Sequence, residues 1–275
     1  MDVIDFHVHI GEPRHYPPGI VDYLREESPE FYARWDEFNK PAVLAQFLRE
    51  QGVRYAVLLA QVTPPIGVMI PNEYVAEYCS GIEMFLPFCS VNPRVHPDPA
   101  RELERLVRGF GFRGLKLYPP YQHYYPNAPE VYPLYAKAAD LGIPVMVHTG
   151  SSVFQGSRIK YGDPVYLDDV AVDFPELTLL IVHSGRGFWY DAAFFLARLH
   201  RNVYMEVAGL PPKRLPVYFP ELERNADKII FGSDWPTPPG RIRENIEAIQ
   251  RLPLQASSIE KILYRNAERL LFGRG

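Results

Sequence analysis

Two histidines near the N-terminus, His7 and His9, have the spacing in this chain that most clearly suggests chemistry. Side chains alternate between the two faces of a β-strand, so histidines two positions apart share a face, with Cα atoms about 6.6 Å apart. Both imidazoles can then reach one ion at the roughly 2.0–2.1 Å of a zinc–nitrogen bond. The pair predicts a metal-binding strand, and two structural histidines at a strand end are the alternative. On the other face we expect apolar residues packed against helices: Ile4, Phe6, Val8 and Ile10.

Further candidate ligands end later apolar runs. His148 follows Val145-Met146-Val147, His183 follows Leu180-Ile181-Val182, and Asp234 lies at the end of Ile230-Phe231-Gly232-Ser233. Enzymes built on a barrel of parallel strands carry their chemistry at the C-terminal ends of the strands. Each of these side chains taken alone fits a structural role. Together, they are expected to converge with the N-terminal pair on one mouth of a barrel, because buried polar groups left unpaired there would each cost about 2–7 kcal/mol.

Short apolar runs alternate with longer helix-like segments, which is typical of an α/β protein. Eight strands with helical connections predict a (β/α)8 TIM barrel. The expected strands are Val3 to His9, Tyr55 to Ala60, Phe85 to Val91, Gly114 to Leu117, Pro144 to His148, Thr178 to His183, Val203 to Val207 and Lys228 to Gly232.

Helix signals complete this pattern. Asp98 is a plausible N-cap for a helix that reaches Arg108 and ends at Gly109, and a second helix runs over 130–141 and ends at Gly142. The run Ser257-Ser258-Ile259-Glu260 predicts a capping box for an extra C-terminal helix. The long segment 11–40 after the first strand is expected to form a lid or pocket wall on the catalytic face.

Composition limits the class of protein. The 275 residues, 47% of them hydrophobic, match one large barrel, so we expect a single domain over 1–275. A net charge of −4 without a basic cluster argues against nucleic-acid binding. The N-terminus lacks a basic, apolar leader and no apolar run approaches the roughly 18 residues of a membrane span, so we predict a cytoplasmic protein without membrane contact.

Four residues are candidates for contact with substrate. Alternation sends Lys116 and Tyr118 into the barrel on the fourth strand, where the ammonium can bind a substrate carboxylate and the ring can pack on a planar substrate. Arg186 follows the sixth strand and can form a forked ion pair with a carboxylate. Glu206 shares a face with Tyr204 and can touch substrate or pair with a cation. Solvated charges and aromatic rings that pack loops or a dimer interface are the alternative, and a homodimer is left open.

Several motifs, taken together, resemble one family. They are similar to those of the amidohydrolase superfamily, in its amidohydrolase-related group, which includes lactonases of pyrone dicarboxylates and nonoxidative decarboxylases of hydroxybenzoates and aminocarboxymuconate semialdehyde. The motifs are Asp5-Phe6-His7-Val8-His9, Gly111-Phe112-Arg113-Gly114-Leu115-Lys116-Leu117, Val147-His148, Val182-His183-Ser184-Gly185, Phe231-Gly232-Ser233-Asp234-Trp235-Pro236 and Asn266-Ala267-Glu268-Arg269-Leu270-Leu271-Phe272.

The resemblance implies one divalent metal, zinc, held by His7, His9, His148 and Asp234, with His183 beside the metal-bound water. Binuclear members of the superfamily carry a carboxylated lysine on the fourth strand, so a second metal is expected only if Lys116 is carboxylated.

The residue types define a mechanism. Zinc lowers the pKa of a bound water to about 7, Asp234 can take a proton from that water, and His183 can orient it. Asp5 can anchor an imidazole N–H or make a buried structural hydrogen bond.

Three functions compete. The first is a metal-dependent hydrolase of a small, carboxylated ester, lactone or amide that uses a zinc-activated water. The second is a nonoxidative, metal-dependent decarboxylase of a hydroxybenzoate-like or muconate-like acid. The third is a noncatalytic metal-binding barrel. Both enzymatic functions require the metal site and a small-molecule substrate, and the sequence does not separate them.

Overall fold

A computed structural model describes residues 1–237 and 241–273 of the chain. Eight parallel strands form one sheet in the order β1-β2-β5-β6-β7-β8-β9-β10. They are β1 (Val3–His9), β2 (Val53–Leu59), β5 (Phe85–Cys89), β6 (Gly114–Leu117), β7 (Val145–His148), β8 (Leu179–Val182), β9 (Val203–Glu206) and β10 (Ile229–Ile230).

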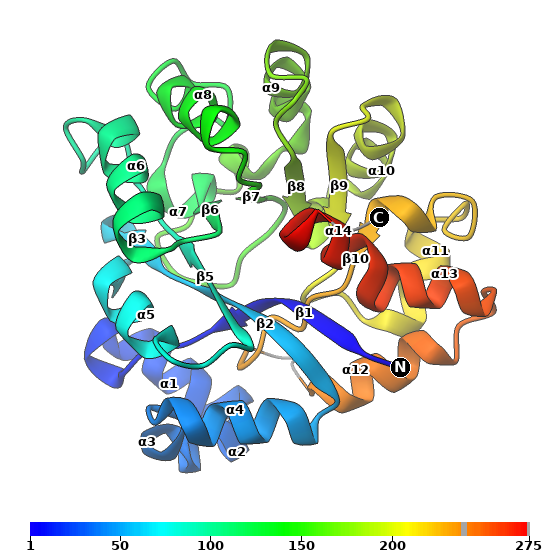
Figure 1. Ribbon diagram of the computed structural model, residues 1–275, viewed down its shortest axis with the longest axis horizontal. Helices are drawn as coiled ribbons and strands as arrows, with labels where there is room; N and C mark the ends of the chain where they lie inside the picture. The colour runs from blue at the N-terminus through cyan, green and yellow to red at the C-terminus, as the bar shows by residue number, and fades with distance from the viewer. Residues whose placement is uncertain (238–240, 274–275) are drawn as a thin grey trace.

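The sheet closes on itself between its last strand and its first. Phe6 N donates a hydrogen bond to Phe231 O over 3.0 Å, and His9 N donates to Trp235 O over 2.8 Å. Helices surround the ring of strands (Figure 1). The predicted (β/α)8 TIM barrel is therefore confirmed.

The helices follow the strands around the barrel. They are α1 (Pro18–Glu27), α2 (Pro29–Ala33), α3 (Trp35–Phe38), α4 (Pro41–Glu50), α5 (Asn72–Cys79), α6 (Pro99–Phe110), α7 (Pro119–Gln122), α8 (Tyr132–Leu141), α9 (Leu167–Asp173), α10 (Tyr190–Leu199), α11 (Leu215–Tyr218), α12 (Ile242–Gln250), α13 (Ala256–Glu260) and α14 (Asn266–Phe272), with short 3-10 turns between them. An antiparallel hairpin of β3 (Gln61–Thr63) and β4 (Val68–Ile70), which the sequence analysis did not predict, follows β2.

Successive residues of a strand face opposite sides of the barrel wall. Leu115 and Leu117 of β6 pack with the helices, whereas Lys116 between them points inward. A separate cluster of buried residues fills the lumen of the barrel: Ile4, Phe6, Val57, Leu59, Leu86, Phe88, Met146, Leu180, Val182 and Ile230.

Strand β1 departs from simple alternation. Ile4 and Phe6 belong to the lumen cluster, so their expected packing against the helices is wrong, whereas Val8 does face the helices. The pairing register with β2 shifts between Asp5 and Val8, and such an irregularity exchanges the two faces of a strand. Apolar side chains at the start of β1 and the two histidines at its end therefore occupy the same interior.

The extra C-terminal helix covers the N-terminal end of the barrel. A π-helical turn (Lys261–Arg265) joins α13 to α14, and Tyr264 and Ala267 complete the lumen cluster. The ring of Phe272 lies 5.1 Å from that of Tyr55, near the start of β2, and α14 appears inside the ring of outer helices (Figure 1). The opposite, C-terminal mouth is left for chemistry.

Helix ends follow the sequence signals in part. The Asp98 side chain accepts a hydrogen bond from Arg101 N, as its N-cap role predicts. The expected stop at Gly109 is wrong, because α6 continues to Phe110 and Gly111 takes the left-handed φ of 73° that ends a helix. The second helix does end at Gly142. The capping box is also absent, because α13 begins at Ala256 with Gln255 as its N-cap, and Ser257 lies inside the helix.

The insertion after β1 forms a wall over the C-terminal mouth. It contains α1, α2 and α3, and it is fixed by hydrogen bonds from Tyr16 Oη to Ile10 O, from Trp35 Nε1 to Gly11 O and from Ser28 Oγ to Pro236 O. Within residues 1–237 and 241–273, no helix has the length and apolar character that crossing a bilayer requires.

Candidate metal centre

Three predicted ligands meet at the C-terminal mouth. His7 Nε2 and His9 Nε2 lie 3.1 Å apart, and Asp234 Oδ1 lies 3.3 Å from the first and 3.4 Å from the second. Two ligands bound at about 2.0–2.1 Å around a tetrahedral ion are separated by about 3.3 Å. The three atoms therefore have the spacing of a metal site before any ion is placed between them.

The charges around these atoms favour a cation. Burial lowers the pKa of His7 well below its ordinary value, so its ring is neutral and offers a lone pair. Burial opposes ionisation of Asp234, but a hydrogen bond with His9 and the Arg186 guanidinium help to lower its pKa to about 2. Two imidazole nitrogens and one carboxylate form a donor set suited to zinc or a similar divalent ion.

His148 lies beside this cluster rather than within it. In the described part of the chain, the ligand atoms of His7, His9 and Asp234 all lie within 4.8 Å of one another, and His148 is not a member of that group. Its Nε2 is buried and has no hydrogen-bond partner among the described residues. An unpaired buried nitrogen is costly, and a bound ion would satisfy it, which fits the predicted fourth ligand.

His183 reaches the site through an unusual backbone conformation. Val182 faces the lumen, so simple alternation would direct His183 outward, but its φ is 60° and that of Ser184 is 49°. This left-handed turn brings the ring inward. Its Nδ1 lies 2.8 Å from Ala208 O and 3.9 Å from Asp234 Oδ2, and the His148 ring centroid lies 4.5 Å away. Burial lowers its pKa well below the ordinary value.

Two further buried carboxylates support His7 in different ways. Asp5 Oδ1 accepts hydrogen bonds from the backbone of His7 over 3.1 Å and of Ser233 over 2.8 Å, so it makes a structural bond and does not hold an imidazole. Glu206 is fully buried, and its Oε1 lies 3.4 Å from His7 Nδ1. Burial raises the pKa of Asp5 to about 7 and that of Glu206 to about 8.

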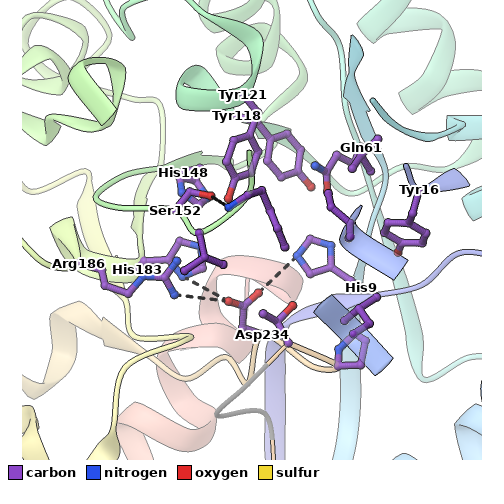
Figure 2. A pocket seen from close by; sticks show the side chains of 17 residues that line it. His9, Tyr16, Gln61, Tyr118, Tyr121, His148, Ser152, His183, Arg186 and Asp234 are labelled. Atoms are coloured by element: carbon purple, nitrogen blue, oxygen red, sulfur yellow. Dashed lines mark hydrogen bonds and ion pairs between the residues drawn. The ribbon is translucent and has the colours of Figure 1, made fainter. Parts of the chain in front are cut away.

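A cavity opens from the cluster toward solvent (Figure 2). Arg186 and Tyr118, both predicted to bind substrate, line it. Other residues around it come from β1, the insertion, the hairpin, α7, β7 and the segments after β7, β8 and β10: His9, Tyr16, Ile20, Leu24, Gln61, Val68, Tyr121, His148, Ser152, Val153, Phe154, His183, Asp234, Pro236 and Thr237. Gln61 gave no sequence signal, because the hairpin that carries it was not predicted.

Arg186 is held against the cluster. Its Nη1 lies 3.8 Å from Asp234 Oδ2, and its Nη2 donates to Ser151 O over 3.0 Å. Gly209, at a φ of 69°, gives it room, since a Cβ there would lie 2.3 Å from Arg186 Nη1. The guanidinium is thus placed where an anion near the cluster would meet it.

Lys116 points inward as predicted but does not belong to the residues that line this cavity. Its ammonium is fully buried and has no hydrogen-bond partner among residues 1–237 and 241–273. Burial lowers its pKa to about 7, although Glu206 opposes the shift. Its contact with substrate remains a prediction.

Comparisons with known proteins agree with the fold. The profile of the family described as Amidohydrolase matches residues 4–273, and the chain belongs to this family. Among curated proteins, a gamma-resorcylate decarboxylase of Rhizobium sp. (strain MTP-10005) is 27% identical over 217 residues, which are 60% of this chain and 64% of that protein. The chain thus matches somewhat less than two thirds of that relative's length.

Solved structures show the same fold. An uncharacterised TIM-barrel protein from Bordetella bronchiseptica is 24% identical with a TM-score of 0.81, and the match covers 100% of both chains. A 5-carboxyvanillate decarboxylase from Novosphingobium aromaticivorans, in complex with manganese and 4-hydroxy-3-methoxy-5-nitrobenzoic acid, is 15% identical with a TM-score of 0.64, over 98% of this chain and 95% of that one.

Proposed function

We propose that the protein is a metal-dependent, nonoxidative decarboxylase of a small aromatic or unsaturated acid. The observation that carries the proposal is that one cavity combines the metal-binding cluster, the Arg186 guanidinium and walls rich in aromatic side chains. The names of the similar decarboxylases support this function, which the sequence analysis ranked second to hydrolysis. We therefore favour an enzyme that acts on a small molecule over a noncatalytic barrel.

The metal would be held by His7, His9, Asp234 and His148. These residues fit a divalent ion because the first three have ligand spacing and His148 Nε2 otherwise lacks a partner. When bound, such an ion would act as a Lewis acid that orients oxygen atoms of the substrate and stabilises negative charge. The sequence predicts zinc. Because a solved decarboxylase contains manganese, manganese is an equal candidate.

The chain's own residues supply binding and proton transfer. Arg186 would bind the substrate's carboxylate, and Tyr118 and Tyr121 would pack against the ring and exclude water. The bond between the carboxyl carbon and the substrate breaks, carbon dioxide leaves, and the electron pair remains on the substrate carbon. That carbon then takes a proton supplied by water, which His183 or Asp234 Oδ2, 3.9 Å apart in the cavity wall, would take up and pass on.

The size of the cavity sets a condition on this function. Its volume is about 50 Å³, whereas a cavity of about 150 Å³ accommodates benzene in another protein. An aromatic substrate therefore requires a wall to move. Phe154 of the loop after β7 lines the cavity and packs against Tyr23 of α1 with their ring centroids 5.7 Å apart, and separation of this pair would widen the cavity.

A comparison of products tests the proposal. Protein reconstituted with Zn²⁺ or Mn²⁺ is offered gamma-resorcylate and 5-carboxyvanillate, and separately a panel of lactones and esters. We expect carbon dioxide release from the hydroxylated aromatic acids. Acid release from the lactones or esters without carbon dioxide would favour the hydrolase, and an ion-loaded protein that turns over neither panel would favour the noncatalytic barrel.

A further inference from the structure

Glu206 contacts both the ring of His7 and the backbone of His183. Its Oε1 lies 3.4 Å from His7 Nδ1 and accepts a hydrogen bond from Ala208 N over 3.2 Å, while its Oε2 accepts one from His183 N over 3.3 Å. The side chain is fully buried at the end of β9. One carboxylate thus faces the ring of His7 and holds the backbone turn that carries His183.

The two nitrogens of His7 face different neighbours. Nε2 points to His9 and Asp234, whereas Nδ1 has no hydrogen-bond partner within ordinary bonding distance and faces Glu206. A neutral imidazole carries its proton on one nitrogen only, and that nitrogen cannot bind a metal. Nε2 is therefore free for a cation only when the proton resides on Nδ1.

We propose that Glu206 is a positioning residue that accepts the Nδ1 proton of His7 and so holds the ring in the orientation and tautomer whose Nε2 binds metal. A carboxylate behind a metal-bound histidine has this effect in general, and its loss typically weakens metal affinity by about 10–100-fold. The inference rests on the metal site of the proposed function.

The residues around Glu206 leave space for its contact with His7. A Cβ at Gly232 would lie 1.9 Å from Glu206 Oε1 and 2.8 Å from His7 Cβ, so glycine leaves the space in which carboxylate and ring meet. Glu206 and Asp234 lie on different sides of the His7 ring, because its two nitrogens point in different directions and each faces a different carboxylate.

Asp5 provides a matched control. It is another fully buried carboxylate next to His7, but it accepts hydrogen bonds from backbone amides and not from the ring. Asp5→Asn keeps an oxygen that can accept these bonds. We therefore expect it to leave the affinity for metal near that of wild type, even where the melting temperature falls.

The test measures metal binding and the ring tautomer separately. Zn²⁺ and Mn²⁺ are titrated into metal-free wild type, Glu206→Gln, Glu206→Leu and Asp5→Asn, with circular dichroism as the check of folding. We expect about one ion per chain in each, with affinity reduced about 10–100-fold in Glu206→Gln and further in Glu206→Leu. ¹⁵N NMR of the metal-free His7 ring, recorded at pH 9 where Glu206 with its pKa of about 8 is ionised, should show the Nδ1–H tautomer in wild type and Asp5→Asn, and its loss in Glu206→Leu.

Each outcome decides the inference. Unchanged affinity and an unchanged His7 tautomer in both folded Glu206 variants would overturn it. Complete loss of binding by a folded Glu206→Gln at saturating ion would also overturn it, because Glu206 would then be a ligand itself. If wild type binds neither ion, the proposed metal site fails, but the NMR measurement on metal-free protein still decides whether Glu206 sets the tautomer.

Discussion

Asp234 and His7 are joined twice, through backbone and side chain. Asp234 N donates to His7 O over 3.0 Å, and Asp234 Oδ1 lies 3.3 Å from His7 Nε2. The first contact belongs to the closure between the last and first strands, and the second belongs to the candidate metal centre. Closing the barrel therefore assembles the site, and a bound ion should in turn stabilise the closed barrel.

Metal removal should lower stability. An ion that binds only the folded chain stabilises it by about 2.7 kcal/mol when its concentration is 100 times Kd. We expect purified protein to hold close to one divalent ion per chain and to melt at a lower temperature after chelation. His7→Ala and His9→Ala should abolish this shift, whereas His96→Ala, outside the site, should keep it. A folded wild type that binds no added zinc or manganese would contradict the prediction.

Asp234→Asn should separate shape from chemistry. The amide nearly preserves the shape of the carboxylate but cannot take up a proton, so we expect a folded variant with weakened metal binding and kcat lower by about 10² or more. Metal analysis and steady-state kinetics on the same preparation measure the two effects. Near-normal kcat with bound metal would remove Asp234 from proton transfer.

His183→Asn should lose turnover but keep the metal. We expect this because His183 Nδ1 is engaged with Ala208 O and lies 3.9 Å from Asp234 Oδ2. His183 also forms a second group with ligand spacing, with His7 and Glu206, and retention of the metal by His183→Asn would exclude that group as the metal site. His148→Asn is the matched comparison and should weaken metal binding instead. If His183→Asn lost the ion and His148→Asn retained it, the two roles would be reversed.

Arg186→Met should raise KM for a carboxylate substrate more than it lowers kcat. A hydrogen bond to a charged group contributes about 1.5–3 kcal/mol, which corresponds to roughly 10–100-fold in affinity. Arg186→Lys should recover part of the loss, since the charge remains but the fork does not. Arg158→Met, an exposed arginine on the same face, serves as the control. Equal KM values for Arg186→Met and wild type would place the carboxylate elsewhere.

Lys116→Met should weaken substrate binding or turnover while metal content stays near wild type, if the lysine is an unmodified ammonium near substrate. Loss of a second metal equivalent in this variant, or a mass increase in wild type that matches a carbamate, would instead indicate a binuclear site. Metal analysis and intact-protein mass spectrometry distinguish the two.

The same variant should also change how stability depends on pH. Burial lowers the pKa of Lys116 from 10.5 to about 7, so between these values the folded chain binds fewer protons than the unfolded chain. The contribution of Lys116 to stability therefore rises with pH in this window. In metal-free protein, the stability gained by Lys116→Met should be larger at pH 6 than at pH 9, as measured by urea unfolding. A gain independent of pH would show that Lys116 keeps an ordinary pKa.

The sequence by itself was enough for the barrel and for the residues at its mouth. Strand periodicity predicted Val3–His9 and Gly114–Leu117 with their exact bounds, because a strand buried on both sides must be apolar and short. Because such a strand is otherwise apolar, a polar residue at its end, such as His148, indicates a position at the barrel mouth. Parallel strands bring their C-terminal ends to one face whatever the details of packing.

Only the tertiary structure decided how those residues meet. Simple alternation cannot place both Phe6 and His7 in the lumen, and a shift in pairing with the neighbouring strand does so. His183 and Asp234 enter the site through left-handed backbone conformations, with φ values of 60° and 64°. The division of labour between Asp5 and Glu206 likewise depends on contacts between strands far apart in sequence. Local residue patterns encode which side chains are buried, whereas register shifts and partners are set by the neighbouring strand, which a local pattern does not contain.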